Sequence, residues 1–256
     1  MNTIIDAHIH LDQYSDQHIH EIIEENEQYG VEALITVSTN KASAKRNLQM
    51  SQIYPTVFPA FGFHPEQALL TEHEQQTLLN WMEENREHMI AIGEVGLPYY
   101  LRQKQELNMD AYRELLTVFI QKAVLWNLPV VLHAVYDDAD IVCDLLEIYS
   151  VKRAHFHWFK GSDKTVQRLA ANGYYISFTP DICYKPTRKH LVKNYPLELI
   201  MVETDGPWSF AGPFEGKQTR PKLIHQSLET LANIRQMRLD ELSSVIHRNT
   251  RAFYRL

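Results

Sequence analysis

The sequence predicts an α/β fold, a single (β/α)8 barrel that spans residues 1–256. Eight apolar stretches of strand length alternate with longer amphipathic stretches along the whole chain. Side chains of His, Asp and Glu fall at the carboxyl ends of several of these strands, where barrels of this kind place their active sites. The length of 256 residues also suffices for one large barrel without a second domain.

The eight predicted strands are short and rich in apolar and β-branched residues, which is typical of a parallel sheet covered by helices. They cover residues 4–10, 33–38, 56–61, 89–94, 129–133, 153–158, 174–178 and 199–204. The main alternative is an open doubly wound sheet. Such a sheet normally carries a glycine-rich phosphate loop, and the sequence contains no GxGxxG, GxxxxGKS or GxxxxGKT motif.

Helices are predicted between the strands, most clearly over residues 109–127. Apolar residues recur there at three- and four-residue steps from position 112 to position 123, as on the buried face of an amphipathic helix. Ser162 or Asp163 is expected to cap a further helix over residues 164–171. The alternation of strand and helix therefore continues through the second half of the chain.

Net charge, hydropathy and cysteine content limit the kinds of protein that this sequence can encode. The formal net charge of -7 argues against broad, non-specific binding of nucleic acid, so a nucleic-acid substrate must be drawn in locally. Apolar runs stay well below the roughly 18 residues of a membrane span, and the chain opens on strand-like sequence, so we expect a cytoplasmic protein without membrane contact. Cys143 and Cys183 are expected to be free thiols, and no obligate protein partner is evident.

The first predicted strand is unusual because its polar face carries ligand-type side chains. In a regular strand, Asp6, His8, His10 and Asp12 all point to the same side, opposite to the apolar residues between them. The polar face of an ordinary half-buried strand more often carries Thr, Ser or Lys. The Asp-x-His-x-His run therefore indicates a face built to hold a ligand.

Five strands supply residues of this kind to the carboxyl-terminal rim of the predicted barrel. Imidazole nitrogen suits Zn, Fe, Ni and Mn, and carboxylates bridge cations and offset their charge. We therefore expect one or two divalent metal ions at the rim, of an identity (Mg, Mn, Zn, Ni or Fe) that the sequence does not determine. The predicted ligands are His8, His10, Glu94, His133, His157 and Asp205.

The motifs "DAHIHLD", "GEVGL", "VLHA", "HWFKG" and "ETDGP" occur in this order across almost the whole chain, which resembles the TatD-type metal-dependent hydrolases of the amidohydrolase superfamily. The resemblance implies that His8, His10 and Asp205 hold the first metal. It implies that His133 and His157 hold the second metal, that Glu94 bridges the two, and that His64 of "GFHPE" lies near the substrate.

Members of this family commonly act as Mg- or Mn-dependent deoxyribonucleases, so the resemblance implies hydrolysis of phosphodiesters in DNA or of a small phosphoester. We expect the attacking group to be a hydroxide that bridges the metals. Asp205 is the predicted general base, and Glu94 is predicted to compensate the charge of the metals.

Two positions depart from the family pattern next to these ligands. Pro98 stands where an Asp is usual, and Val135 stands where an Arg that grips phosphate is common. We predict that other side chains contact the substrate in their place, with Trp208 stacking on a base. The candidates are His64, Lys160, Arg220 and Trp208, with Lys185 and Lys217 as further possibilities.

Two buried positions are predicted to support the ligands. Asp6 is expected to orient a ligand imidazole through its other ring nitrogen, although a carboxylate satisfied by backbone groups is the alternative. His155 lies two residues before His157 on the same strand, and we expect it to be a buried, hydrogen-bonded histidine rather than a direct ligand.

The sequence is also compatible with other functions. A hydrolase of the same superfamily could cleave an amide, a lactone or a small phosphoester, since barrels exchange chemistry through their loops. A phosphoesterase of the polymerase-and-histidinol-phosphatase type also begins with Asp-x-His-x-His but normally has a different later pattern of ligands. A non-catalytic metal-binding protein is the alternative from another class, and an intact set of ligands argues against it.

Overall fold

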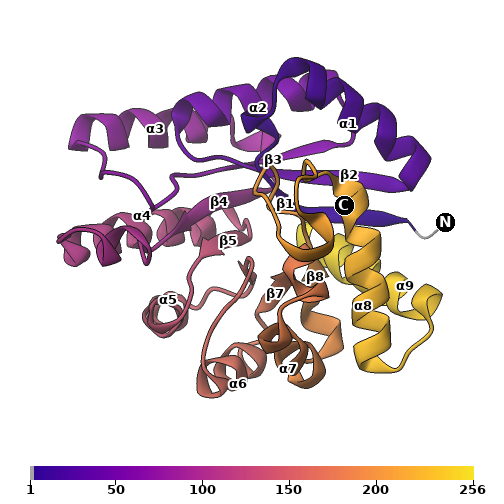
Figure 1. Ribbon diagram of the computed structural model, residues 1–256. Helices are drawn as coiled ribbons and strands as arrows, with labels where there is room; N and C mark the ends of the chain where they lie inside the picture. Colours follow the sequence, from indigo (N-terminus) through magenta and orange to yellow (C-terminus); the bar gives the residue numbers. More distant parts are fainter. Residues whose placement is uncertain (1–2) are drawn as a thin grey trace.

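The computed structural model describes residues 3–256, and its eight parallel strands lie side by side in chain order. Figure 1 shows these strands at the centre of the molecule with helices around them. The (β/α)8 prediction is confirmed. The strands are β1 (Ile4–Ile9), β2 (Val31–Val37), β3 (Val57–Phe61), β4 (Ala91–Gly96), β5 (Val130–His133), β6 (Ala154–Phe156), β7 (Tyr175–Phe178) and β8 (Ile200–Val202).

A helix follows each strand, and the last strand is followed by two. None of the helices within residues 3–256 is long and apolar enough to cross a membrane. The helices are α1 (Asp16–Tyr29), α2 (Lys41–Ile53), α3 (Glu72–Glu84), α4 (Met109–Trp126), α5 (Asp137–Ile148), α6 (Asp163–Ala171), α7 (Pro186–Asn194), α8 (Ile224–Arg235) and α9 (Leu239–Tyr254).

Helix α4 matches the predicted amphipathic helix closely. Tyr112, Leu115 and Phe119, which recur at three- and four-residue steps, are all buried against the strands. Helix α6 begins where the capping signal predicted, because the hydroxyl of Ser162 accepts a hydrogen bond from the backbone N–H of Thr165 at 3.2 Å. Local sequence signals therefore determine where these helices lie and begin.

The barrel closes where the end of β8 meets β1. The backbone N–H of Asp205 donates to the carbonyl of His8 at 2.9 Å, and the N–H of His10 donates to the carbonyl of Gly206 at 2.8 Å. Two predicted metal-ligating segments from opposite ends of the chain are thus joined directly by backbone hydrogen bonds. The hydrogen bonds that close the barrel therefore also fix the spacing of these two segments.

Asp6 reinforces this closure and does not orient an imidazole, so the prediction for Asp6 is wrong. Its carboxylate accepts hydrogen bonds from the N–H of Thr204 at 2.9 Å and from the Thr204 hydroxyl at 2.5 Å. A third bond comes from the backbone N–H of His8 at 3.3 Å. With these three donors, two of them backbone N–H groups, the carboxylate links β1 to the end of β8, and no hydrogen bond joins it to an imidazole nitrogen of residues 3–256.

The prediction that side chains alternate strictly between two faces along the first strand is also wrong. Ile5 and Ala7 belong to a small cluster with the C-terminal Tyr254, whereas Ile9 belongs to the large core cluster. The pairing of β1 with β2 shifts register between Asp6 and Ile9. A 3-10 turn begins at Leu11, so Asp12 no longer follows the alternation of a strand.

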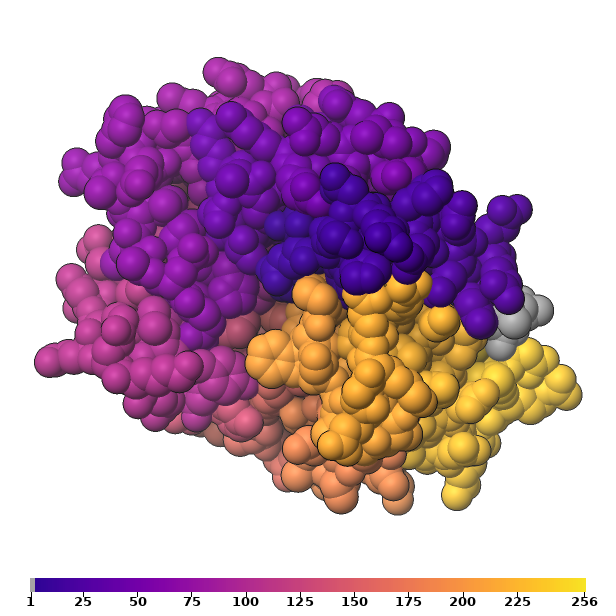
Figure 2. All heavy atoms as spheres, turned by 45° about the horizontal axis from the view of Figure 1, so that its top comes forward, coloured from indigo at the N-terminus to yellow at the C-terminus, as the bar shows by residue number. Residues whose placement is uncertain are grey.

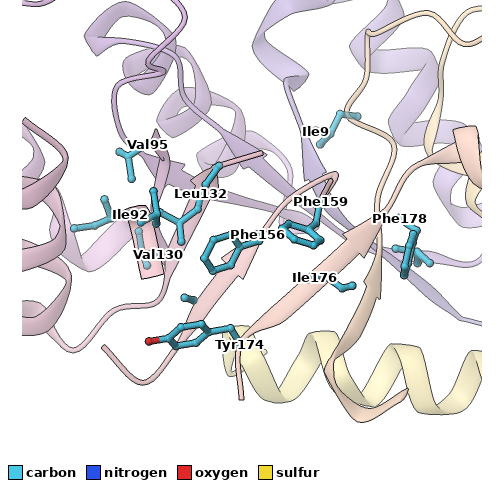
Figure 3. Close-up of a cluster of buried hydrophobic side chains, with 14 of the residues drawn as sticks. Ile9, Ile92, Val95, Val130, Leu132, Phe156, Phe159, Tyr174, Ile176 and Phe178 are labelled. Atoms are coloured by element: carbon cyan, nitrogen blue, oxygen red, sulfur yellow. The ribbon is translucent and has the colours of Figure 1, made fainter. Parts of the chain in front are cut away.

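The large core lies between the strands and the surrounding helices, and Figure 3 shows a part of it. The ring of Phe156 on β6 lies 6.1 Å from the ring of Phe159 and 6.0 Å from the ring of Tyr174. All three side chains are buried. Such aromatic packing makes β6 a rigid support for the residues that follow it at the mouth of the barrel.

The segment of residues 206–220, predicted as a long ordered loop, covers the closure between β8 and β1. The Tyr14 hydroxyl donates to the carbonyl of Thr219 at 2.7 Å, and Arg220 forms ion pairs with Glu21 and Glu25 on α1. Figure 2 shows this orange segment against the indigo N-terminal part of the chain.

We predict that Phe156→Ala lowers the free energy of unfolding by about 3–5 kcal/mol, because it opens a cavity in a tightly packed core. Ile148→Ala is the matched control, since Ile148 is 70% exposed on α5 and its truncation is expected to cost less than about 0.5 kcal/mol. Urea unfolding followed by circular dichroism measures both values. Equal losses in the two variants would contradict the packing described for β6.

Candidate metal centre

The buried carboxylate of Glu94 lies between two groups of imidazoles. Its Oε2 atom lies 3.3 Å from His8 Nε2 and 3.4 Å from His10 Nε2. Its Oε1 atom lies 2.7 Å from His157 Nε2 and 3.0 Å from His133 Nδ1. The two oxygens of one carboxylate therefore face nitrogen atoms of different strands.

Asp205 adds a second carboxylate to one side of Glu94. Its Oδ1 atom lies 3.4 Å from His8 Nε2 and 3.5 Å from His10 Nε2. The structure thus brings together all six predicted ligands. We name His8, His10 and Asp205 the first group, and His133 and His157 the second group, with Glu94 between them.

His64 joins the second side of this arrangement. Its Nε2 atom lies 3.4 Å from Oε1 of Glu94, and its ring centroid lies 4.8 Å from that of His133. Burial lowers the pKa of His64, which favours the neutral imidazole. His64, predicted to lie near the substrate, is therefore within reach of the same cluster and could also serve as a ligand.

The donor atoms of these residues fit a metal ion. Within residues 3–256, Nδ1 and Nε2 of His8 and Oε2 of Glu94 are buried without a hydrogen-bond partner, because the contacts around them are long or poorly aligned. Ligand atoms of His8, His10 and Glu94 lie within 4.8 Å of one another, as do those of His64, Glu94 and His133. A cation satisfies such orphaned nitrogen and oxygen atoms, which a metal-free cluster leaves unpaired.

Charges of opposite sign stabilise one another in this cluster. Burial lowers the pKa of His8, but the carboxylates of Glu94 and Asp205 outweigh it and raise that pKa to about 9. The pKa values of His10, His133 and His157 are likewise raised to about 9 against the effect of burial. Protons and metal ions therefore compete for the same imidazoles.

The pKa values of the two carboxylates shift in the opposite direction. Burial raises the pKa of Glu94, yet the positive charges of His157, His64 and His8 hold it well below its usual range. Burial has the same effect on Asp205, whose pKa is nevertheless lowered by the nearby imidazoles of His10 and His8. Both acids are consequently ionised at neutral pH and available to bind cations.

Sequence reasoning missed two acids that hold the second group. Oε1 of Glu66 lies 3.1 Å from Nε2 of His133, on the side of the ring turned away from Glu94. Oε1 of Glu203 lies 3.5 Å from Nδ1 of His157, which is again the nitrogen turned away from Glu94. Such partners fix the orientation of a ligand imidazole. The signal was available, because both acids lie two residues from a predicted site residue, in "GFHPE" and "ETDGP".

His155 lies below His157 and is connected to it through other side chains. It contacts the hydroxyl of Ser177 at 2.7 Å through Nε2 and the hydroxyl of Tyr254 at 2.9 Å through Nδ1. Ser177 in turn donates to Glu203 at 2.6 Å. Burial lowers the pKa of His155 well below its usual range, so it is a neutral, hydrogen-bonded histidine, as its position on the strand suggests.

Arg220 is not placed to bind substrate as predicted. Its guanidinium pairs with Glu21 at 2.5 Å and with Glu25 at 2.8 Å, and it donates to Gln218 at 3.0 Å through Nε. These partners occupy its donors and tie the loop of residues 206–220 to α1. A phosphate would have to displace two carboxylates from this arginine.

The other predicted substrate contacts differ in their surroundings. Lys217 is exposed and donates to the carbonyl of Pro213, and Lys185 is exposed beside the ring of Tyr184. Lys160 and Trp208 lie close to the candidate metal centre, because Lys160 contacts Tyr100 beside His133 and the backbone N–H of Trp208 donates to Asp205.

We predict that Mn²⁺ raises the melting temperature of the metal-depleted protein more at pH 8 than at pH 6. The folded-state pKa values of the imidazoles, about 9, exceed the ordinary value of 6.5. Stabilisation by imidazole protons is therefore complete below pH 6.5 and is lost as the pH rises toward 9, whereas binding of metal grows over the same range. Thermal melts with Mn²⁺ or with a chelator measure this difference, and equal increments at both pH values would contradict it.

Comparison with known proteins agrees with this geometry. The chain matches the family described as TatD related DNase over residues 5–255. A Haemophilus influenzae protein named as an uncharacterized metal-dependent hydrolase is 39% identical over 255 residues, which cover 99% of this chain and 100% of that protein. The human protein named deoxyribonuclease TATDN3 is 28% identical, with 96% of this chain and 92% of that protein covered.

The fold agrees as well. The crystal structure of YJJV, a TatD homologue from Escherichia coli, superposes with a TM-score of 0.89 at 23% identity and covers 99% of this chain and 98% of its own. The resemblance inferred from the five motifs is therefore confirmed, and this chain belongs to the TatD family of metal-dependent hydrolases.

Proposed function

We propose that this protein is a phosphodiesterase of the deoxyribonuclease type that works with two divalent metal ions. The observation that carries the proposal is the position of Glu94, whose two oxygens face the imidazoles of the first and the second group separately. A carboxylate placed in this way can bridge two cations. A pair of bound cations supplies Lewis acidity toward a phosphoryl oxygen and lowers the pKa of water toward neutrality.

The side chains of the first and the second group would bind the metal ions. His8, His10 and Asp205 would hold one ion, and His133 and His157 would hold the other. Mn²⁺ and Mg²⁺ are the expected ions, while Zn²⁺, Ni²⁺ and Fe²⁺ suit the same imidazoles. Glu66 and Glu203 would keep the two imidazoles of the second group in the orientation that binding needs.

Asp205 is the proposed general base. It is 7% exposed, so it borders the space that substrate and water enter at the mouth of the barrel. Its lowered pKa leaves the carboxylate ionised but weakly basic at neutral pH, so it would accept the proton of a water that bound cations have made more acidic. Glu94 is completely buried, so it serves to compensate positive charge rather than to exchange protons with solvent.

The name of the human relative, a deoxyribonuclease, supports DNA as the substrate. The net charge of -7 means that DNA must be captured by local contacts at the mouth. A second candidate, hydrolysis of an amide, a lactone or another small ester, is favoured by Val135. This side chain is 2% exposed and apolar, so it offers a phosphate no positive charge two residues after His133.

We predict that Asp205→Asn lowers kcat/KM for bis-p-nitrophenyl phosphate by about 100-fold or more, the usual contribution of a general base. The melting temperature should stay within a few degrees of the parent, because the amide keeps the shape of the side chain. Asp110→Asn on α4 is the control, since the side chain of Asp110 is 84% exposed and pairs with Arg113 on the same helix. Activity of Asp205→Asn within a few-fold of the parent would remove Asp205 from catalysis.

We also predict that His157→Ala lowers the metal content by about one ion per chain, because the second group loses one of its nitrogen ligands. His190→Ala is the matched control, with a side chain that is 66% exposed on α7. Elemental analysis after dialysis against Mn²⁺ gives the count for each variant. An unchanged count for His157→Ala would argue against a second metal.

A further inference from the structure

Lys160 is held at the mouth of the barrel without an acidic partner. Its Nζ lies 2.9 Å from the hydroxyl of Tyr100 and 4.0 Å from the ring centroid of Trp158. Among residues 3–256, no carboxylate lies within ion-pair distance of this ammonium group. A hydroxyl and aromatic faces contact this half-buried charge, and the nearest acids act on it only from beyond ion-pair distance, so an anion can approach it.

A second cation lies beside Lys160. Arg188 on α7 has a side chain that is 14% exposed, and its Nε donates to Oδ2 of Asp181 at 3.0 Å. The same Asp181 oxygen accepts a hydrogen bond from Nε1 of Trp158 at 2.9 Å. Burial and the positive charge of Arg188 lower the pKa of Lys160 to about 8. Asp181 thus pairs directly with Arg188, whereas Lys160 has no carboxylate at ion-pair distance among the described residues.

This pair of cations adjoins the candidate metal centre. The ring centroid of Tyr100, the hydrogen-bond partner of Lys160, lies 6.1 Å from that of His133. The backbone N–H of Tyr100 donates to Glu66 at 2.8 Å, and Glu66 contacts His133. Lys160 itself follows His157 by three residues in the chain. An anion bound by Lys160 would therefore lie next to the second group.

An open aromatic surface completes the surroundings. Trp208 is 59% exposed, and its ring packs edge to face on Trp158 with the centroids 5.5 Å apart. Its backbone N–H donates to the carbonyl of Asp205 at 3.0 Å, which anchors it at the end of β8. An exposed tryptophan that is held by packing can stack on a nucleobase.

We propose that Lys160, Arg188 and Trp208 form a nucleotide subsite beside the metal centre, in which the two cations hold a phosphate and Trp208 stacks on the base. This inference rests on the proposed function and narrows it to nucleotides. The subsite would also supply the positive charge that the apolar Val135 does not. The phosphate would then be bound from the β6–α6 loop and from α7 instead of from the segment after β5.

Calorimetric binding of thymidine 5′-monophosphate and of thymidine to the purified, metal-loaded protein tests the phosphate contact. Lys160→Met should weaken binding of the monophosphate by about tenfold or more, since it removes a charge-assisted hydrogen bond, and should leave thymidine unchanged. Lys160→Arg should retain binding within about threefold, because it restores the charge. Lys164→Met is the matched control, since Lys164 is exposed at the start of the following helix α6.

Ribose 5-phosphate separates the base from the phosphate. Trp208→Ala should weaken binding of thymidine 5′-monophosphate by about fivefold or more and leave ribose 5-phosphate unchanged, because only stacking on the base is lost. Melting temperatures near that of the parent show that each variant is folded. Arg188→Met, which should also weaken the monophosphate, replaces Lys160→Met if that variant does not fold.

The subsite is overturned if Lys160→Met binds the monophosphate as tightly as the parent, or if Lys164→Met loses the same affinity. It is also overturned if the parent binds the monophosphate no more tightly than thymidine. These results do not depend on turnover. If the protein hydrolyses no phosphodiester but Lys160→Met weakens binding of the monophosphate, the proposed function is contradicted and the subsite is supported. If the protein hydrolyses a phosphodiester but Lys160→Met binds the monophosphate as the parent does, the function is supported and the subsite is contradicted.

Discussion

A single buried negative charge organises the mouth of this barrel. Glu94 is inaccessible to solvent on β4, and an ionised carboxylate in such a place is costly unless positive groups surround it. Imidazoles from β1, β5 and the end of β6 meet this need, and they approach its two oxygens from different sides. The same arrangement that stabilises Glu94 in the folded protein brings together groups of His, Asp and Glu side chains that could hold metal ions.

The fold supports this arrangement from the floor of the barrel upward. Tyr254, at the end of α9, contacts His155, and Ser177 connects His155 to Glu203. Glu203 then faces the outer nitrogen of His157. Because these side chains are buried and the series is hydrogen-bonded as far as Glu203, the C-terminal helix helps to place the carboxylate that faces an imidazole at the opposite end of the strands. Residues that touch no substrate thus contribute to the geometry of the site.

The fold and the six central side chains could be predicted because both follow from local patterns, strand periodicity and residue type at strand ends. Asp6 and Arg220 could not, because their partners come from distant parts of the chain. Asp6 pairs with Thr204 across the closure of the barrel, and Arg220 pairs with α1. Glu66 stands two residues after His64 in a motif of the site, but its contact with His133 depends on how the loop after β3 folds, which strand and helix periodicity do not show.

The central claim, that Glu94 lies between two cations, is tested most directly by anomalous diffraction from crystals grown with Mn²⁺. The account predicts two anomalous peaks in each molecule. One should lie within coordination distance of Oε2 of Glu94 and of His8, and the other within coordination distance of Oε1 and of His157. A single peak, or two peaks of which only one contacts Glu94, would contradict it.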